Sequence, residues 1–365
     1  MKCFRQFSEL TIDNPDGRIT PCCWFDISKN DQWYQYNNIF NDTKTNYYFW
    51  SDIQDRMENG WIDECHLCEK LERENQSSMR TEYDFFDKNK VKSIHISLDF
   101  TCNMMCRTCQ PNLSSKWAAD KQFLDELQKI DYNHYNYRVK EKNYFENLKI
   151  YLNSLDLSNI ENIVIVGGEP FISKNLKWFL RLFKNPKKIK IMIDTNGSII
   201  PDNETLKILN NFLNVQLNVS VDATENLFEV LRYGVKWKII KNNILKFKNI
   251  LNNLNLNITT VISIMNVNFL NSIVDFKNSI SEDIKINPIE LYWPNHLIHY
   301  QIPLSYRKNW ITGDQKIDDK ILTNKRTKNE FQKFIKFTKM LDEKHNNSFR
   351  ECNPVIWRIV NENKF

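Results

Sequence analysis

Three closely spaced cysteines are the most chemically suggestive feature of the 365-residue sequence. Cys102, Cys106 and Cys109 form the pattern CxxxCxxC directly after a strand-like stretch, Ser93 to Phe100. Cysteine thiolates are the usual protein ligands of iron–sulfur clusters. Three of them can hold three irons of a four-iron cluster and leave the fourth open to a small molecule, whereas closed zinc sites use four ligands. The spacing therefore predicts an iron–sulfur cluster with one open iron.

A second group of cysteines lies near the start of the chain. Cys3 and Cys22 are followed by the CxxC pair Cys65 and Cys68. Cys23 is a spare thiol that could be buried or could substitute for Cys22. In a long chain without an apolar signal core, cysteines are better explained as metal ligands than as disulfides. From the residues alone, zinc and iron–sulfur remain open for this group.

Polar residues also follow the next strand-like stretches. Asn162–Val166 leads into Gly167-Gly168-Glu169-Pro170. Two glycines after a buried strand let the main chain approach a ligand, and a carboxylate there can pair with an ammonium group. Taken alone, this is also an ordinary Gly-Gly turn, just as Asn196-Gly197 after the following strand is an ordinary turn pair. Asp222 and Glu225, after the fourth strand, fit a helix-capping pair.

The chain from residue 91 alternates between strand-like and helix-like segments. The expected strands are Ser93–Phe100, Asn162–Val166, Lys188–Ile193, Val215–Val221, Asn257–Ile264 and Ile284–Leu291. The amphipathic stretches between them are Ser114–Lys129, Asn143–Leu155, Ser173–Lys184, Asn203–Phe212, Thr224–Leu231, Lys236–Leu251 and Asn268–Ile280. Strands that alternate with helices predict an α/β fold with a parallel sheet. In barrels built this way the chemistry lies at the carboxyl ends of the strands, where the polar residues above are found.

The N-terminal part has a different pattern. Glu9–Ile12 and Arg18–Trp24 flank the turn signal Asn14–Gly17 and predict a β-hairpin, followed by charged helices over Asp52–Glu64 and Glu69–Gln76. We therefore expect a small cysteine-rich domain over residues 1–85, a core over 91–300 and a C-terminal helical extension over 301–365, with an amphipathic helix at Lys325–His345.

CxxxCxxC after a first strand, with GGEP after the second, resembles the motifs of the radical S-adenosylmethionine (radical SAM) enzymes. The resemblance implies a partial, open (β/α)6 TIM-like barrel in which Cys102, Cys106 and Cys109 hold a [4Fe–4S] cluster that also binds S-adenosylmethionine. It implies that the methionyl amino group is bound by Gly167, Gly168, Glu169 and Pro170. It further suggests that Asn196 lines the pocket, that Ser220 contacts the ribose or carboxylate, and that Arg232 pairs with the carboxylate. Thr108 stands where the family often has an aromatic residue, so the adenine contact must come from elsewhere.

The spacing Cys3-x13-Gly17-x4-Cys22, followed by a CxxC, resembles the SPASM and twitch domains of these enzymes. The resemblance implies an auxiliary [4Fe–4S] cluster on Cys3, Cys22, Cys65 and Cys68. In many relatives this domain follows the core, whereas here it precedes it.

The resemblance implies reductive cleavage of S-adenosylmethionine to a 5′-deoxyadenosyl radical that abstracts hydrogen from a substrate. Four cysteines at the auxiliary cluster leave no iron open, so we expect it to accept an electron during oxidation of a peptide or protein. The electron donor would be a reductant such as flavodoxin or ferredoxin. The alternatives are a radical SAM enzyme acting on a sugar or nucleotide and a non-catalytic metal-binding interaction module. No catalytic acid or base is assigned, although His296 and His299 follow the sixth strand.

Charge and hydropathy exclude other classes. The formal net charge of +5 is small for this length and the basic residues are dispersed, so we expect no nucleic-acid partner. The sequence has no run of about 18 apolar residues, which predicts no membrane-spanning helix. Because the first residues lack a signal core, we expect a cytoplasmic protein.

Overall fold

The computed structural model describes residues 3, 5, 8–12, 17–30, 38–40, 43–81, 91–136, 143–325, 327 and 329–362, with the side chains of 43–50 left aside. The chain divides into two compact units. The first unit is Met1–Phe100, Arg138–Ile193 and Asn203–Val215, and the second is Thr101–Tyr137, Asp194–Asp202 and Gln216–Phe365. Both units draw on distant parts of the sequence, so the division of the chain at residues 85, 91 and 300 stays a prediction.

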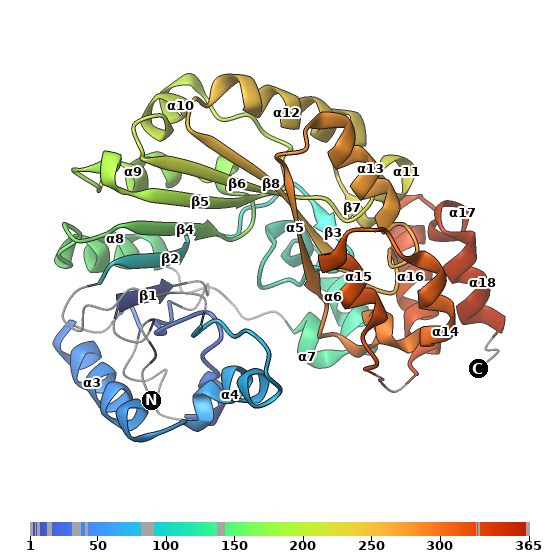
Figure 1. The fold of residues 1–365 in the computed structure, drawn as a ribbon, viewed down its shortest axis with the longest axis horizontal. Coiled ribbons are helices and arrows are strands. Elements are labelled where there is room, and N and C mark those ends of the chain that lie inside the picture. Colours follow the sequence, from blue (N-terminus) through green and yellow to red (C-terminus); the bar gives the residue numbers. More distant parts are fainter. Residues whose placement is uncertain are drawn as a thin grey trace. The chain divides into compact units, whose positions relative to one another are not determined.

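A parallel sheet is the main element of the fold, and its strand order is β1-β2-β4-β5-β6-β8-β9 (Figure 1). The strands are β1 (Glu9–Ile12), β2 (Ser93–Ser97), β4 (Asn162–Val166), β5 (Lys190–Thr195), β6 (Asn214–Ser220), β8 (Leu254–Ile262) and β9 (Lys285–Glu290). In the first unit β2 pairs in parallel with β1 and β4, and β4 with β5. In the second unit β8 pairs in parallel with β9. The order ends at β1 and β9, which confirms the predicted α/β fold with an open, partial barrel.

The six predicted core strands are confirmed, with most ends shifted by a few residues, and all but β9 carry one face of buried aliphatic side chains. In β4, for example, Ile163 and Ile165 are buried while their neighbours are half-buried. The helices of the first unit are α3 (Thr43–Asn59), α4 (His66–Arg73), α8 (Tyr144–Ser154), α9 (Leu176–Leu180) and α10 (Asn203–Leu209). The unit also has 3₁₀ turns at Ile27–Lys29, Asp63–Cys65, Pro170–Ile172 and Pro186–Lys188.

The predicted N-terminal hairpin is only partly correct. Thr11 and Thr20 form an isolated antiparallel bridge with two backbone hydrogen bonds of 2.9 Å. Within the described residues, however, Arg18–Trp24 is not a strand, and β1 instead joins the main sheet beside β2. All four β1 residues are buried, so both faces of this strand are covered. The turn at residues 13–16 lies outside the described part of the chain.

The second unit contains the cysteine loop and most of the later helices. Its short strands are β3 (Met105–Cys106) and β7 (Arg232–Tyr233), which pair with each other. The helices are α5 (Ser115–Ala118), α6 (Lys121–Gln128), α7 (Tyr132–Tyr135), α11 (Glu225–Leu231), α12 (Trp237–Ile250), α13 (Leu270–Ile280), α14 (Leu304–Arg307), α15 (Gln315–Leu322), α16 (Phe331–His345), α17 (Phe349–Cys352) and α18 (Pro354–Glu362), with 3₁₀ turns at Asn295–Leu297, His299–Gln301 and Lys308–Trp310.

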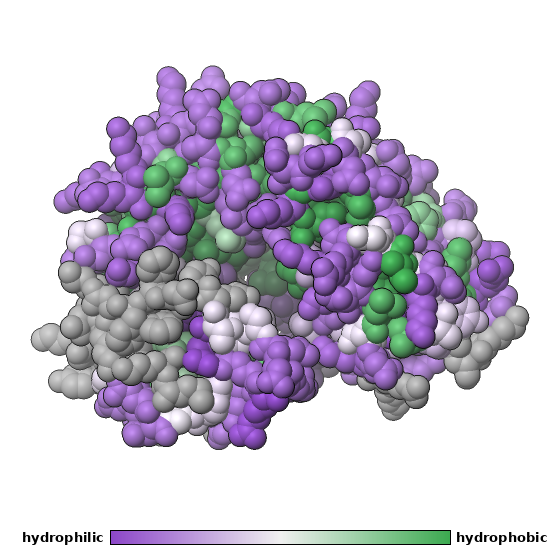
Figure 2. Space-filling view, viewed as in Figure 1, coloured by the Kyte–Doolittle hydropathy of each residue, from purple (hydrophilic) through white to green (hydrophobic). Residues whose placement is uncertain are grey.

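The helices of this unit are amphipathic. In α12, Ile240, Ile244 and Phe247 are fully buried, whereas Ile239 and Leu245 are exposed among lysines and asparagines. The surface over α12 is accordingly mostly hydrophilic with isolated hydrophobic residues (Figure 2). No helix in the described ranges is long and apolar enough to cross a membrane.

Candidate functional site

The cysteine loop is held against the segment that follows α11. Cys106 pairs with Arg232 and Met105 with Tyr233 across β3 and β7, and the Arg107 N–H donates to the Leu231 carbonyl at 2.8 Å. Gly234 completes this contact, because it has a φ of +121° and a Cβ there would lie 2.6 Å from the Asn103 carbonyl oxygen. The RYG segment is thus a backbone support for the loop, and only glycine fits at its third position.

Side chains from α5 and from its N-cap residue, Ser114, fix the loop from the other end. The Ser115 hydroxyl accepts from the Cys102 N–H at 3.0 Å, and the Ser114 hydroxyl donates to the Met104 carbonyl at 3.0 Å. The Trp117 indole N–H donates to the Cys106 carbonyl at 3.0 Å, and Trp117 is fully buried. These bonds satisfy backbone groups that a loop of this kind would otherwise leave without partners.

The three loop thiols are half-buried and form no disulfide. Burial raises the pKa of Cys106 to about 12. Burial, followed by repulsion from Cys106 and Cys102, raises the pKa of Cys109. Three neighbouring thiols in this environment would ionise together only beside a compensating positive charge, which iron supplies. The donor set therefore fits an iron–sulfur cluster.

Two predicted cofactor-binding residues lie beside the loop cysteines. The Nδ2 of Asn196 is 4.0 Å from the Cys102 sulfur and donates to Asn103 Oδ1 at 2.9 Å. The Nη1 of Arg232 is 3.9 Å from the Cys106 sulfur. Both groups are hydrogen-bond donors, so they favour negative charge on the sulfurs.

Asp222 is a site residue whose role sequence reasoning missed. Its carboxylate accepts from Arg232 Nε at 2.9 Å and from the Val261 N–H of β8 at 2.8 Å. The capping interpretation was wrong, since Thr224 is the N-cap of α11 and Glu225 instead accepts from the Trp237 indole. The sequence signal that could have indicated this ion pair was Asp222 itself, a single acidic residue directly after a strand and ten positions before Arg232. Ser220 is the half-buried last residue of β6.

The GGEP segment belongs to the first unit and follows β4. Gly167 has a φ of +122°, and a Cβ there would lie 2.5 Å from the Asp99 carbonyl oxygen and 2.6 Å from Ser97 Oγ. The close approach that requires glycine is therefore to the end of β2. Glu169 is buried, and its carboxylate accepts from the Phe171 N–H at 3.2 Å, capping the turn that Pro170 begins.

Four N-terminal cysteines line one small cavity of the first unit, with a volume of about 10 Å³, namely Cys3, Cys22, Cys65 and Cys68. All four are buried, whereas Cys23 is half-buried and does not line the cavity. Burial, followed by the charges of Glu9, Cys23 and Cys3, raises the pKa of Cys22. Trp24, Trp61 and Met57 also line it, so the thiols are shielded by large apolar side chains.

No group of three or more His, Cys, Asp or Glu in the described ranges is arranged to hold a metal ion. A four-iron cluster distributes its cysteines over separate irons, so it needs more widely spaced sulfurs than a single ion does.

His296 and His299, which could have served as acid or base, are instead core residues of the second unit. Both are fully buried, and burial lowers the pKa of His296 to about 3 and that of His299 to about 4. His296 packs edge-on against Phe337 of α16 at a ring separation of 5.2 Å.

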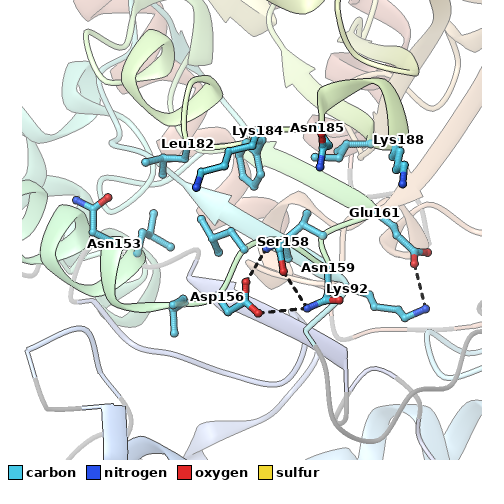
Figure 3. Close-up of a pocket in the computed structure, with 16 residues that line it drawn as sticks. Lys92, Asn153, Asp156, Ser158, Asn159, Glu161, Leu182, Lys184, Asn185 and Lys188 are labelled. Atoms are coloured by element: carbon cyan, nitrogen blue, oxygen red, sulfur yellow. Dashed lines mark hydrogen bonds and ion pairs between the residues drawn. The ribbon is translucent and has the colours of Figure 1, made fainter.

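A further pocket of the first unit lies at the amino ends of β2, β4 and β5, away from the strand ends that carry the motifs (Figure 3). Lys92 and Glu161 form an ion pair of 3.0 Å on its rim, and Asp156 accepts from the Ser158 N–H at 2.9 Å (Figure 3). None of the predicted site residues lines this pocket.

The model of the Radical SAM superfamily matches residues 86–276, more than half of the chain. The chain belongs to this superfamily and is an enzyme. Membership implies a [4Fe–4S] cluster and S-adenosylmethionine as cosubstrate.

Individual relatives are more distant. The GTP 3′,8-cyclase of Campylobacter jejuni subsp. doylei is 28% identical over 144 residues, which are 39% of this chain and 38% of the relative. The chain therefore matches about two fifths of the length of this relative. The structure of anSMEcpe with bound AdoMet is 16% identical, with a TM-score of 0.37 over 70% of this chain and 62% of that one. Streptococcus suis SuiB bound to precursor peptide SuiA is 15% identical, with a TM-score of 0.38 over 75% and 60%.

Proposed function

We propose that this radical SAM enzyme oxidises a peptide or protein, with a second [4Fe–4S] cluster on Cys3, Cys22, Cys65 and Cys68 as the electron acceptor. The observation that carries the proposal is the single cavity lined by these four thiols. A four-cysteine set leaves no iron open to a substrate, so the cluster would transfer electrons and not bind the substrate. The domain would then be of the twitch type.

In the second unit, Cys102, Cys106 and Cys109 would hold the catalytic cluster. Asn196 and Arg232 donate toward two of these sulfurs, and Asp222 fixes the guanidinium. A reduced cluster held here would supply the electron for reductive cleavage of S-adenosylmethionine, and hydrogen abstraction from the substrate would follow.

In the first unit, Gly167 to Pro170 would bind the methionyl amino group. The buried Glu169 carboxylate is already oriented by its bond from Phe171, so little conformational freedom would be lost on binding. Ser220 is the proposed ribose contact, and a flavodoxin or ferredoxin is the proposed electron donor.

A nucleotide substrate is the second candidate. It is favoured by the similarity to proteins named GTP 3′,8-cyclase, which covers about two fifths of the chain.

Anaerobic reconstitution with iron and sulfide tests the two clusters. We expect about eight irons per chain and no zinc. Each single variant, Cys65→Ser or Cys102→Ser, should lose one of the two clusters and hold about four irons. Cys23→Ser is the matched control and should keep the full count. About four irons with one zinc, or a full count in Cys65→Ser, would contradict the auxiliary cluster.

Product analysis tests the reaction. Reduced enzyme with S-adenosylmethionine should release 5′-deoxyadenosine, and Cys106→Ala should release none. A peptide substrate should stimulate release and lose two hydrogen atoms by mass spectrometry. If GTP stimulates release and peptides do not, the nucleotide candidate replaces the peptide.

A further inference from the structure

One face of β6 carries a polar row in the second unit. Leu217 and Val219 are fully buried, and α12 packs against the neighbouring strand β8 (Figure 1). Alternation along a strand places Gln216, Asn218 and Ser220 on the opposite face. A polar face on a central strand needs partners, and the adjacent strands provide them.

Hydrogen bonds join this row to β5 and β8. Asn218 Nδ2 donates to Asp194 Oδ1 at 2.8 Å. Asn218 Oδ1 accepts from Gln216 Nε2 at 3.0 Å and from Asn257 Nδ2 at 3.3 Å. Asn218 and Asn257 are both more than nine-tenths buried.

The Asp194 carboxylate determines which groups donate and which accept in this network. An ionised carboxylate only accepts hydrogen bonds, so Asn218 must turn its amide N–H groups toward Asp194. Its oxygen then faces Gln216 and Asn257, which must both donate. One N–H of each of the three amides is thereby used inside the network, and the oxygens of Gln216 and Asn257 accept none of these bonds. In the described part of the chain, the buried Asn257 Oδ1 has no hydrogen-bond partner.

The network also carries an uncompensated charge. Within the described residues, Asp194 forms no ion pair. Asp194 is exposed by its accessible surface, so a ligand can reach its carboxylate. Desolvation by the surrounding protein atoms raises its pKa, with the bond from Asn218 acting in the opposite direction. Leftover acceptors beside a carboxylate that lacks a cation are complementary to a positively charged hydrogen-bond donor.

We propose that Asp194, Asn218 and Asn257 form a substrate subsite for a cationic amine, such as the ammonium group of a peptide lysine. The assignment rests on the proposed peptide function. Asp194 and Asn218 each lie two residues, about 7 Å along a strand, before the candidate cofactor residues Asn196 and Ser220. An amine held here would bring the adjoining substrate carbons toward the cofactor end of the strands.

Two probes test the subsite on the reconstituted full chain with S-adenosylmethionine. They are acetyl-Gly-Lys-Gly-amide and its norleucine analogue, which has no ammonium group, and binding is followed by saturation-transfer NMR and calorimetry. We expect the lysine probe to bind at least about tenfold more tightly than the analogue. Asp194→Asn should remove this preference, because an asparagine oxygen can still accept from Asn218 but carries no charge. Equal binding of both probes by the unchanged enzyme would overturn the subsite.

Matched variants separate the possible failures. Glu282→Gln removes an exposed negative charge from the same unit and should keep the preference for lysine. Asn257→Ala removes the unpartnered oxygen and should also weaken binding of the lysine probe. This variant provides a second test of the subsite if Asp194→Asn fails to fold. A preference that survives in both variants would refute the proposal. Iron content and 5′-deoxyadenosine release are recorded in parallel, so loss of the subsite alone is distinguishable from failure of the proposed function.

Discussion

The guanidinium of Arg232 lies between a carboxylate and a cluster-ligand candidate, with Nη1 3.9 Å from the Cys106 sulfur and Nε 2.9 Å from Asp222 Oδ2. The side chains of Arg232 and Asp222 are 9% and 3% exposed, so water screens this ion pair poorly. Arg232 was expected to bind the cofactor carboxylate. The observed contacts add a role toward the thiolate, since a buried cation beside a sulfur stabilises negative charge on it.

Replacing Arg232 should therefore change the reduction potential of the cluster. A reduced cluster carries one more negative charge, which the guanidinium stabilises, so Arg232→Gln should lower the midpoint potential. Asp222→Asn leaves the cation with less compensation and should raise it. The measurement is a redox titration of reconstituted protein followed by electron paramagnetic resonance.

Arg358→Gln is the control for this pair, because it removes an exposed arginine of the same unit. It should leave the potential unchanged. Shifts of the same sign in Arg232→Gln and Asp222→Asn would contradict the electrostatic role.

Gly234 should be required for cluster assembly. In Gly234→Ala the new methyl group would meet the Asn103 carbonyl oxygen at 2.6 Å, so the cysteine loop must move. We expect clearly reduced iron content after reconstitution.

Gly313→Ala is a close control, since Gly313 also has a positive φ, of +81°, but no atom lies within 4 Å of the new Cβ. It should lose only about 1–2 kcal/mol of unfolding free energy and keep its iron. Equal iron content in the two variants would argue against the backbone support.

Sequence reasoning was most successful where the signal was local. It located the cysteine loop, the GGEP segment and β4 because each depends on neighbouring residues. It placed Asn196 and Arg232 among the site residues only through the resemblance, and their contacts with Cys102 and Cys106 span 94 and 126 positions. No periodicity encodes such distances.

The missed features are likewise long-range. β1 pairs with β2 more than eighty positions later, whereas the local turn signal favoured a hairpin. Gly167 was interpreted as making room for a ligand, yet the atoms that exclude a side chain belong to Ser97 and Asp99. In both places tertiary packing decides between alternatives that are equally acceptable locally.

Arg107 should connect the C-terminal helices to the stability of the cysteine loop. It is fully buried, and its guanidinium forms an ion pair with Asp342 of α16 and donates to the Val230 carbonyl at 3.0 Å. Arg107→Ala would leave Asp342 without its cation and should cost about 3–5 kcal/mol of unfolding free energy. Lys129→Ala, which removes an exposed i,i+3 ion pair with Glu126 in the same unit, should cost less than about 1 kcal/mol. Urea unfolding followed by circular dichroism measures both, and similar losses would refute the buried-pair account.

His299 should make folding less stable in mild acid. Burial lowers its pKa to about 4, against about 6.5 in an unfolded chain. Between these values the unfolded state binds the proton and the folded state does not, so stability is undiminished above pH 6.5 and falls as the pH drops toward 4. The full loss for this one group is about 3 kcal/mol.

His299→Gln removes the titration while the amide can still donate to the Lys320 carbonyl, the partner of Nε2 at 3.2 Å. Unfolding curves between pH 7 and 4 should therefore show a shallower decline in the variant than in the unchanged protein. Parallel declines would show that His299 is not a source of the acid sensitivity.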